Sequence, residues 1–186
     1  MENMSWADGG REPSMKIHLA PPSEGCRDSF LRGLREFRLE GLPWWVGGDL
    51  ELAEKDFAAF VAKRLAGSNR TTETAVPKTH LWALAEGQFV GRISIHHELT
   101  DALRIEGGHI GYDTVPSFRG RGVATEMLHQ ALPVARLLGL VEVLLTCDET
   151  NTASIRVIEK NGGVLRDTVV LGVNRPANRH YWITLA

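Results

Sequence analysis

The residues whose types and spacing best suit chemistry are the run RGRGVA over residues 119–124, which combines two glycines with two arginines. A strand is expected before this run, over 108–115, and a helix with a regular apolar face is expected over about 120–138. The start of a helix leaves N–H groups unpaired and carries the positive end of the helix dipole, so it attracts an anion. Glycines let the backbone approach that anion closely, and the arginines add positive charge. The run therefore predicts a phosphate-binding turn.

Two other phosphate-binding motifs do not fit this run. The pattern GxxxxGK[ST] is absent, and the third glycine of GxGxxG is missing because Thr125 follows Ala124. A basic, glycine-rich connection that binds nothing remains the alternative interpretation for these six residues alone.

The elements that must position this turn alternate between helices and strands. Helices are expected over about 23–40, 50–65, 120–138 and 151–161. Strands are expected over about 16–19, 80–86, 89–97, 108–115, 141–146, 164–171 and 180–185. Residues 141–146 are almost continuously apolar, which is typical of a strand covered on both faces. The order of elements predicts the α/β class, with one mixed sheet and flanking helices.

Composition narrows the class of protein further. The 186 residues are 43% hydrophobic and 24% charged with a net charge of −2, as in an ordinary soluble domain and unlike a general nucleic-acid binder. No apolar run approaches the roughly 20 residues that cross a bilayer. We expect a disordered leader over residues 1–14, a single domain over 15–186, and a location in the cytoplasm. Cys26 and Cys147 are expected to be reduced thiols, and no Cys/His cluster has the spacing of a zinc site.

The chain resembles the GNAT superfamily of acyl-coenzyme A N-acyltransferases, firmly over residues 80–171. Arg119, Gly122 and Ala124 match in register the cofactor loop of that superfamily, Gln/Arg-x-x-Gly-x-Gly/Ala. The segment NTASIRVIEKNGG over 151–163 is similar to a helix pattern of the branches that acetylate ribosomal proteins and small amines, and GHIGYDTVP over 108–116 is typical of the superfamily. The resemblance implies a GNAT-like fold with a central, mixed sheet that splays.

The resemblance also implies where acetyl-coenzyme A binds, namely between strands 108–115 and 141–147, which run parallel and separate at their C-terminal ends. Free backbone groups near 114 and 115 would pair with the pantetheine arm, and the amides of 121–125 would hold the pyrophosphate. The implied cofactor residues are Thr114, Val115, Arg119, Gly120, Arg121, Gly122, Val123, Ala124, Thr125, Asn151, Ser154 and Lys160. No metal is implied.

The activity implied by the resemblance is N-acetylation, in which a neutral amine attacks the thioester directly in a ternary complex. Glu106 and His109 are the candidate bases, and strand alternation allows at most one of them to face the cleft. An amide near 114 or 115 would stabilise the oxyanion. Many relatives carry a tyrosine seven residues after the helix asparagine, where this chain has Ile158, so Ser154 or water is the expected acid. An ordinary structural role remains the alternative for each of these side chains.

Two functions of other classes stay open on sequence grounds. One is a coenzyme A-binding sensor or scaffold without catalysis, and the other is a phosphate- or nucleotide-binding protein outside the superfamily. The acceptor is expected to be a primary amine of a small molecule or a peptide, with no nucleic-acid or membrane partner, and a homodimer is possible.

Overall fold

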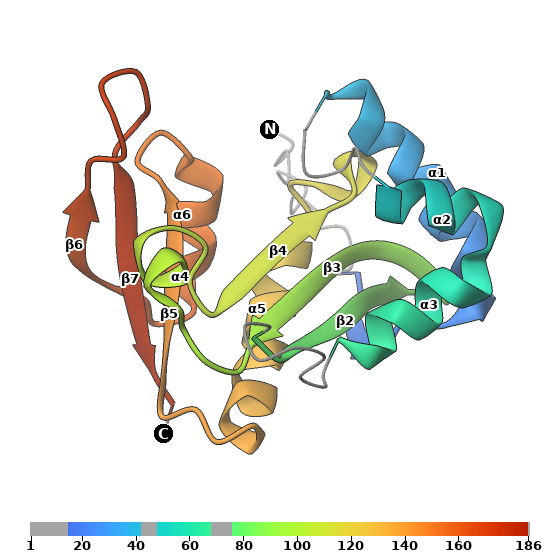
Figure 1. Ribbon diagram of the computed structural model, residues 1–186, viewed down its shortest axis with the longest axis horizontal. Coiled ribbons are helices and arrows are strands. Elements are labelled where there is room, and N and C mark those ends of the chain that lie inside the picture. The colour runs from blue at the N-terminus through green and yellow to red at the C-terminus, as the bar shows by residue number, and fades with distance from the viewer. Residues whose placement is uncertain (1–14, 42–47, 68–75, 186) are drawn as a thin grey trace, which may run out of the picture.

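The strands form two antiparallel sheets in the computed structural model, which describes residues 15–41, 48–67 and 76–185 (Figure 1). The expected leader over residues 1–14 lies outside these ranges. The first sheet has the order β1-β2-β3-β4, and the second has the order β5-β7-β6. Their bounds are β1 His18–Ala20, β2 Lys78–Ala85, β3 Gln88–His96, β4 Ile110–Thr114, β5 Glu142–Asp148, β6 Val164–Val169 and β7 Asn178–Thr184.

The helices follow the expected order, with two differences. Their bounds are α1 Arg27–Leu39, α2 Gly48–Lys55, α3 Phe57–Ala66, α4 Asp101–Ile105, α5 Val123–Leu137 and α6 Thr152–Lys160. The single helix expected over 50–65 is divided, because Asp56 leaves the helical conformation and its side chain accepts a hydrogen bond from the amide of Ala59, which starts α3. The short helix α4 was not anticipated.

The two sheets meet at one end of β4 and β5. There the amide of His109 donates to the carbonyl of Leu144 at 2.7 Å, and the amide of Leu144 donates to Nδ1 of His109 at 2.9 Å. Beyond this junction β4 and β5 point the same way but diverge, as Figure 1 shows. The expected α/β class with a splayed, mixed sheet is therefore confirmed, and the mixed part is confined to this junction.

Both faces of the first sheet are covered by helices. Met127 and Leu128 of α5 pack with Ile93 and Ile95 on one face, in a core that continues to Leu145 of the second sheet. An aromatic cluster of Phe30, Phe57, Phe60, Trp82 and Phe89 joins α1 and α3 to the opposite face. The arrangement leaves the rest of this second face, toward β4 and β5, for polar side chains.

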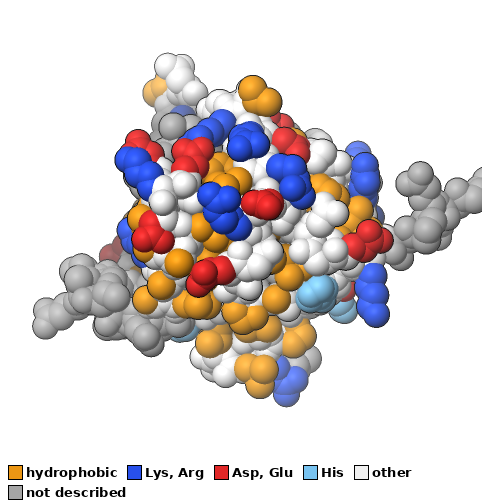
Figure 2. All heavy atoms as spheres, turned by 90° about the vertical axis from the view of Figure 1, so that its right-hand side faces the viewer, with side chains coloured by type: hydrophobic (Ala, Val, Ile, Leu, Met, Phe, Trp, Pro, Cys, Tyr) orange, Lys and Arg blue, Asp and Glu red, His pale blue; other side chains and the backbone are white. Residues whose placement is uncertain are grey.

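Helices α1 to α3 form the side of the molecule shown in Figure 2, where acidic and basic side chains are interspersed. Among the helices that the structure describes, none is both long and apolar enough to span a membrane. Cys26 and Cys147 are free and buried.

Candidate functional site

The glycine-rich turn leads into α5 and leaves its first amides exposed to a cavity. Gly120 and Gly122 have φ angles of 75° and 81°, left-handed values that favour glycine. A Cβ placed on either would meet no atom within 4 Å, so the space beside both residues is open. The first bond of the helix runs from the amide of Glu126 to the carbonyl of Gly122, which leaves the amides of residues 123–125 without helical partners. An anion can therefore bind here.

A cavity of about 920 Å³ lies between this turn, the end of β4 and α6. Its lining includes most of the residues expected from the sequence: Thr114, Arg119, Gly120, Gly122, Val123, Ala124, Thr125, Asn151, Ser154 and Lys160. The hydroxyl of Thr114 is buried and has no hydrogen-bond partner among the described residues, so it is available to a ligand. We call this space the cofactor cavity.

The expectation that Val115 offers a free amide is wrong. Its amide donates to the carbonyl of Val90 on β3 at 3.0 Å, and its side chain is buried with the aromatic cluster. Because hydrogen-bonding groups alternate along an antiparallel strand, the amides of Tyr112 and Thr114 point the other way, toward the diverging β5. These two amides are the ones that face the opening between the sheets.

The two arginines of the turn have partners within the protein. The guanidinium of Arg119 donates to both carboxylate oxygens of Glu40, at 2.6 and 2.8 Å, and to the carbonyl of Thr114. The guanidinium of Arg121 lies over the ring of Phe118, and Arg121 does not line the cofactor cavity. Both arginines thus have contacts that shape the turn itself.

A cation that the sequence analysis missed lies on α6. Arg156 lines the cofactor cavity together with Lys160, one helical turn away. The spacing of four residues puts the two cations on one face of the helix, which is the signal that identifies Arg156 from sequence. Asn151 caps the same helix by accepting a hydrogen bond from the amide of Ser154 at 3.0 Å.

A second cavity, of about 500 Å³, opens at β4 and β5 and extends over the polar face of the first sheet. It shares Tyr112, Asp113 and Ser154 with the cofactor cavity, so the two spaces meet at these residues. The hydroxyl of Tyr112 donates to the backbone carbonyl of Ser154 at 3.5 Å, and burial raises the pKa of Tyr112 to about 12. Tyr112 lies within the strand quoted above, but its position between two cavities has no signature in the sequence. We call this second space the acceptor cavity.

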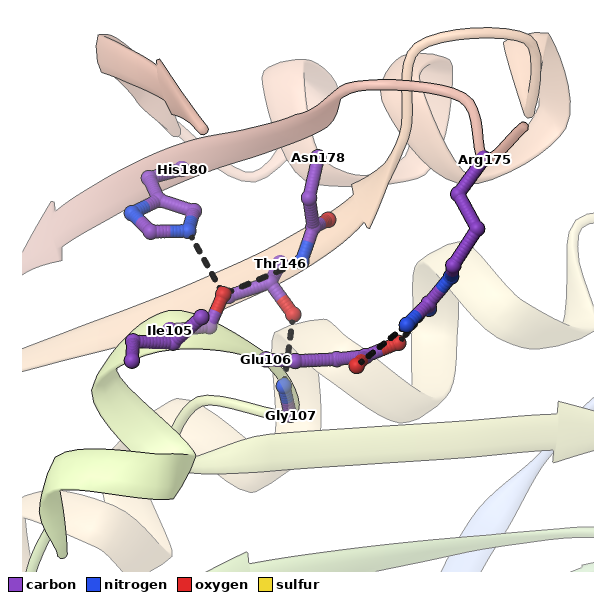
Figure 3. A network of polar contacts seen from close by, with 7 residues as sticks. All are labelled: Ile105, Glu106, Gly107, Thr146, Arg175, Asn178 and His180. Atoms are coloured by element: carbon purple, nitrogen blue, oxygen red, sulfur yellow. Dashed lines mark hydrogen bonds and ion pairs between the residues drawn. The ribbon is translucent and has the colours of Figure 1, made fainter. Parts of the chain in front are cut away.

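Glu106 lines the acceptor cavity and is held there by a network of hydrogen bonds (Figure 3). Its carboxylate is paired with the guanidinium of Arg175, on the loop between β6 and β7. The amide of the following residue, Gly107, donates to the hydroxyl of Thr146 on β5 at 2.9 Å. The side chains of Asn178 and His180 on β7 donate to the carbonyl of the preceding Ile105. The loop after α4 is therefore anchored to the second sheet.

His109, the other candidate base, lies in the junction and lines neither cavity. It is 6% exposed, and its Nδ1 accepts the hydrogen bond from Leu144. Burial lowers the pKa of His109 to about 4, so the ring is neutral near pH 7. Ile158, at the position where many relatives carry a tyrosine, is 1% exposed and packs in the core. Of the two candidate bases, Glu106 therefore lines a cavity and His109 does not.

The arrangement defines a class of protein, one with an α/β fold whose glycine-rich helix start is able to accept a phosphate group beside a second cavity. Residues 28–164 match the acetyltransferase (GNAT) domain, and the chain belongs to this family of acyltransferases. No curated protein sequence matches the chain significantly. The described residues contain no group of three or more His, Cys, Asp or Glu side chains that is able to hold a metal ion.

Several solved structures share the fold. RimJ of Mycobacterium smegmatis, in complex with a coenzyme A disulfide, superposes with a TM-score of 0.66 at 20% identity over 92% of this chain and 83% of that chain. RimL, a ribosomal L7/L12 alpha-N-protein acetyltransferase in complex with coenzyme A, gives 0.65 at 16% identity over 93% and 97%. YncA of Salmonella typhimurium, an acetyltransferase with acetyl-CoA bound, gives 0.59 at 17% identity over 94% and 95%.

Proposed function

We propose that this protein transfers the acetyl group of acetyl-coenzyme A to a primary amine of a small molecule or peptide, by direct attack in a ternary complex. The observation that carries the proposal is the meeting of the cofactor cavity and the acceptor cavity at Tyr112, Asp113 and Ser154. Direct transfer requires both ligands at once with their reacting atoms adjacent. The similar RimL acts on an alpha-amino group, as its name states, which supports an amine acceptor here.

The residues of the cofactor cavity fit coenzyme A. Pyrophosphate oxygens would accept hydrogen bonds from the amides of residues 123–125, where the two glycines leave open space. Arg156 and Lys160 supply positive charge for phosphate groups. The amides of Tyr112 and Thr114 face the opening between the sheets, where an extended arm pairs like an added strand. Bound there, acetyl-coenzyme A supplies an activated acetyl group.

Glu106 is the proposed base, acting directly or through a water molecule. It lines the acceptor cavity, whereas His109 lies in the junction between the sheets. Its carboxylate takes the proton that the amine must lose before or during attack. The contact with Arg175 fixes the position of the carboxylate.

Glu106→Gln is expected to lower kcat about 10-fold or more, because an amide cannot take the proton of the amine. The Kd for coenzyme A is expected to stay unchanged, because Glu106 does not line the cofactor cavity. Steady-state thiol release and calorimetry measure the two quantities. Glu51→Gln is the matched control, since it also removes an exposed carboxylate paired with a neighbouring cation, Lys55, but one that lines neither cavity. An unchanged kcat in Glu106→Gln would refute Glu106 as the base.

The hydroxyls of Tyr112 and Ser154 are proposed to stabilise the leaving thiolate. A phenol with a pKa of about 12 is a weaker acid than a thiol, whose pKa is about 8.5, so Tyr112 donates a hydrogen bond rather than its proton. Solvent then protonates the thiolate. Ser154 lines both cavities and is placed to make the same kind of contact.

Tyr112→Phe and Ser154→Ala are each expected to lower kcat about 5-fold with little change in the KM for acetyl-coenzyme A, the effect of one lost hydrogen bond. Tyr181→Phe is the control, because Tyr181 is a buried tyrosine whose hydroxyl bonds to Glu159 and which lines neither cavity. A rise in the KM for acetyl-coenzyme A with an unchanged kcat would instead give these residues a role in binding.

The second candidate is a coenzyme A-binding sensor or scaffold, favoured by Ile158 at the position of the usual tyrosine. Calorimetry with coenzyme A and thiol release with a panel of amines separate the two functions. Tight binding of coenzyme A without turnover of any amine would favour the sensor over the transferase, and no binding at all would exclude both.

A cytoplasmic location and a homodimer stay predictions.

A further inference from the structure

The polar side chains of the acceptor cavity are distributed by the register of the first sheet. His80 on β2 pairs with Ser94 on β3, and Arg92 on β3 pairs with Asp113 on β4. Because paired and alternate residues share a face, Lys78 lies on this same face. The opposite face packs against α5. Five polar positions on three strands are thus directed to one side, where they line the cavity.

One end of the acceptor cavity is positively charged. Arg64 of α3, Lys78 and Arg92 line it, and among the described lining residues there only Asp113 carries a negative charge, in an ion pair with Arg92 at 2.8 Å. Burial, together with the charges of Arg92 and Arg64, lowers the pKa of Lys78 to about 8. Burial lowers the pKa of His80 to about 3, so this ring adds no charge near pH 7. Three cations and one carboxylate thus line this end among the described residues, an excess of positive charge that attracts an anion.

The other end of the acceptor cavity carries negative charge. Glu106 and Asp148 line it, on the loop after α4 and at the end of β5, whereas Arg175, the ion-pair partner of Glu106, does not line the cavity. Between the two ends lie β4 and the meeting point with the cofactor cavity. Since neighbouring strands are about 4.8 Å apart, β2 and β5 are separated by roughly 14 Å or more. A ligand that fills the cavity thus meets opposite charges at its two ends.

We propose that the acceptor is a small primary amine that also carries an anionic group, a carboxylate or a phosphate, bound with its amine toward Glu106 and its anion toward Arg64, Lys78 and Arg92. This inference rests on the proposed function and narrows its acceptor. The volume of about 500 Å³ suits a small molecule or the first one or two residues of a peptide. The ammonium is drawn to Glu106 and Asp148 beside Ser154, where it loses its proton and reaches the acetyl group.

Matched pairs of acceptors test the proposal, because each pair differs only in the anionic group. β-Alanine is compared with β-alaninamide, O-phosphoethanolamine with ethanolamine, and 6-aminohexanoate with 6-aminohexanamide, by kcat/KM for thiol release. The longer pair is included because β2 and β5 are separated by roughly 14 Å or more. The anionic member is expected to react at least about 10-fold better, the value of one charged hydrogen bond. A dipeptide with a C-terminal carboxylate, compared with its amide, distinguishes a peptide source from a free small molecule. Equal kcat/KM within every pair would overturn the proposal.

Variants of Lys78 locate the effect. Lys78→Gln is expected to reduce the preference for the anionic member about 10-fold, Lys78→Arg to retain it, and Lys78→Glu to reverse it. Lys16→Gln is the control, because it removes an exposed lysine outside the cavity. It is expected to show the same preference as the parent protein. A preference that is unchanged in Lys78→Glu would contradict the assignment of this end of the cavity.

Binding measurements keep this inference separate from the proposed function. Calorimetry of each acceptor pair against the protein saturated with coenzyme A needs no turnover. If no amine releases thiol, the transferase proposal fails, and tighter binding of the anionic member still supports the anion site. Equal binding of both members overturns the anion site even where acetyl transfer is observed.

Discussion

Gly122→Glu is expected to raise the Kd for coenzyme A at least 100-fold, equivalent to about 2.7 kcal/mol of binding free energy. Two effects act together in this variant. Gly122 has a φ of 81°, a conformation that side-chain-bearing residues rarely adopt, so the turn is distorted. The new carboxylate also enters the open space in front of the first amides of α5, where the phosphates would bind, and repels them.

Gly139→Glu separates these two effects. Gly139 follows the other end of α5, has a φ of 89°, is exposed, and also has no atom within 4 Å of an added Cβ. The control therefore carries the same backbone strain and the same charge, away from the cofactor cavity. Calorimetry should give it the Kd of the parent protein. Equal affinities of the two variants for coenzyme A would disprove the anion-binding role of the turn.

The cofactor half of the site was predictable because its residues are nearly contiguous in the sequence. Glycines that require left-handed φ angles, the helix start after them, and the asparagine cap of α6 each depend on a few neighbouring residues. Local patterns of this kind are preserved whatever the rest of the fold does. What sequence did not reveal is the pairing of Arg119 with Glu40, 79 positions away.

The acceptor half was not predictable in the same way. Arg64, Lys78, Arg92, Glu106 and Asp148 come from five separate segments, and no spacing in the chain links them. The register between β2 and β3 puts Lys78 and Arg92 on one face, the packing of α3 adds Arg64, and the junction with β5 adds the carboxylates. Such a cluster arises from tertiary structure, so it becomes visible only when the strands are paired.

His109 shows why the choice of a base required the structure. A histidine at the start of a cleft strand suits proton transfer because of its usual pKa. Strand alternation alone could not decide whether His109 or Glu106 faces the cleft. The structure instead places its ring between two sheets, where Nδ1 accepts the amide hydrogen of Leu144. Two positive-φ glycines, at 107 and 108, turn the chain so that Glu106 is displaced from the strand into the acceptor cavity.

Gly108→Ala is expected to lower the free energy of unfolding by about 3 kcal/mol, combining the cost of a left-handed alanine with that of overpacking. Gly108 has a φ of 64°, and a Cβ there would lie 2.4 Å from the carbonyl oxygen of Leu144. That oxygen accepts the hydrogen bond from His109 that joins the two sheets. The variant must either break this bond or move β5 away from β4.

Thermal unfolding followed by circular dichroism measures the effect, which for a chain of this size corresponds to a fall in Tm of roughly 10 °C. Gly111→Ala, three residues later on β4, is the matched control, because its added Cβ would meet nothing closer than Ser94 Oγ at 3.9 Å and its φ is not positive. The control should stay within about 0.5 kcal/mol of the parent protein. Equal stability of the two variants would mean that β4 and β5 separate at Leu144 without cost, and a junction that yields so easily would not hold the two cavities in register for direct transfer.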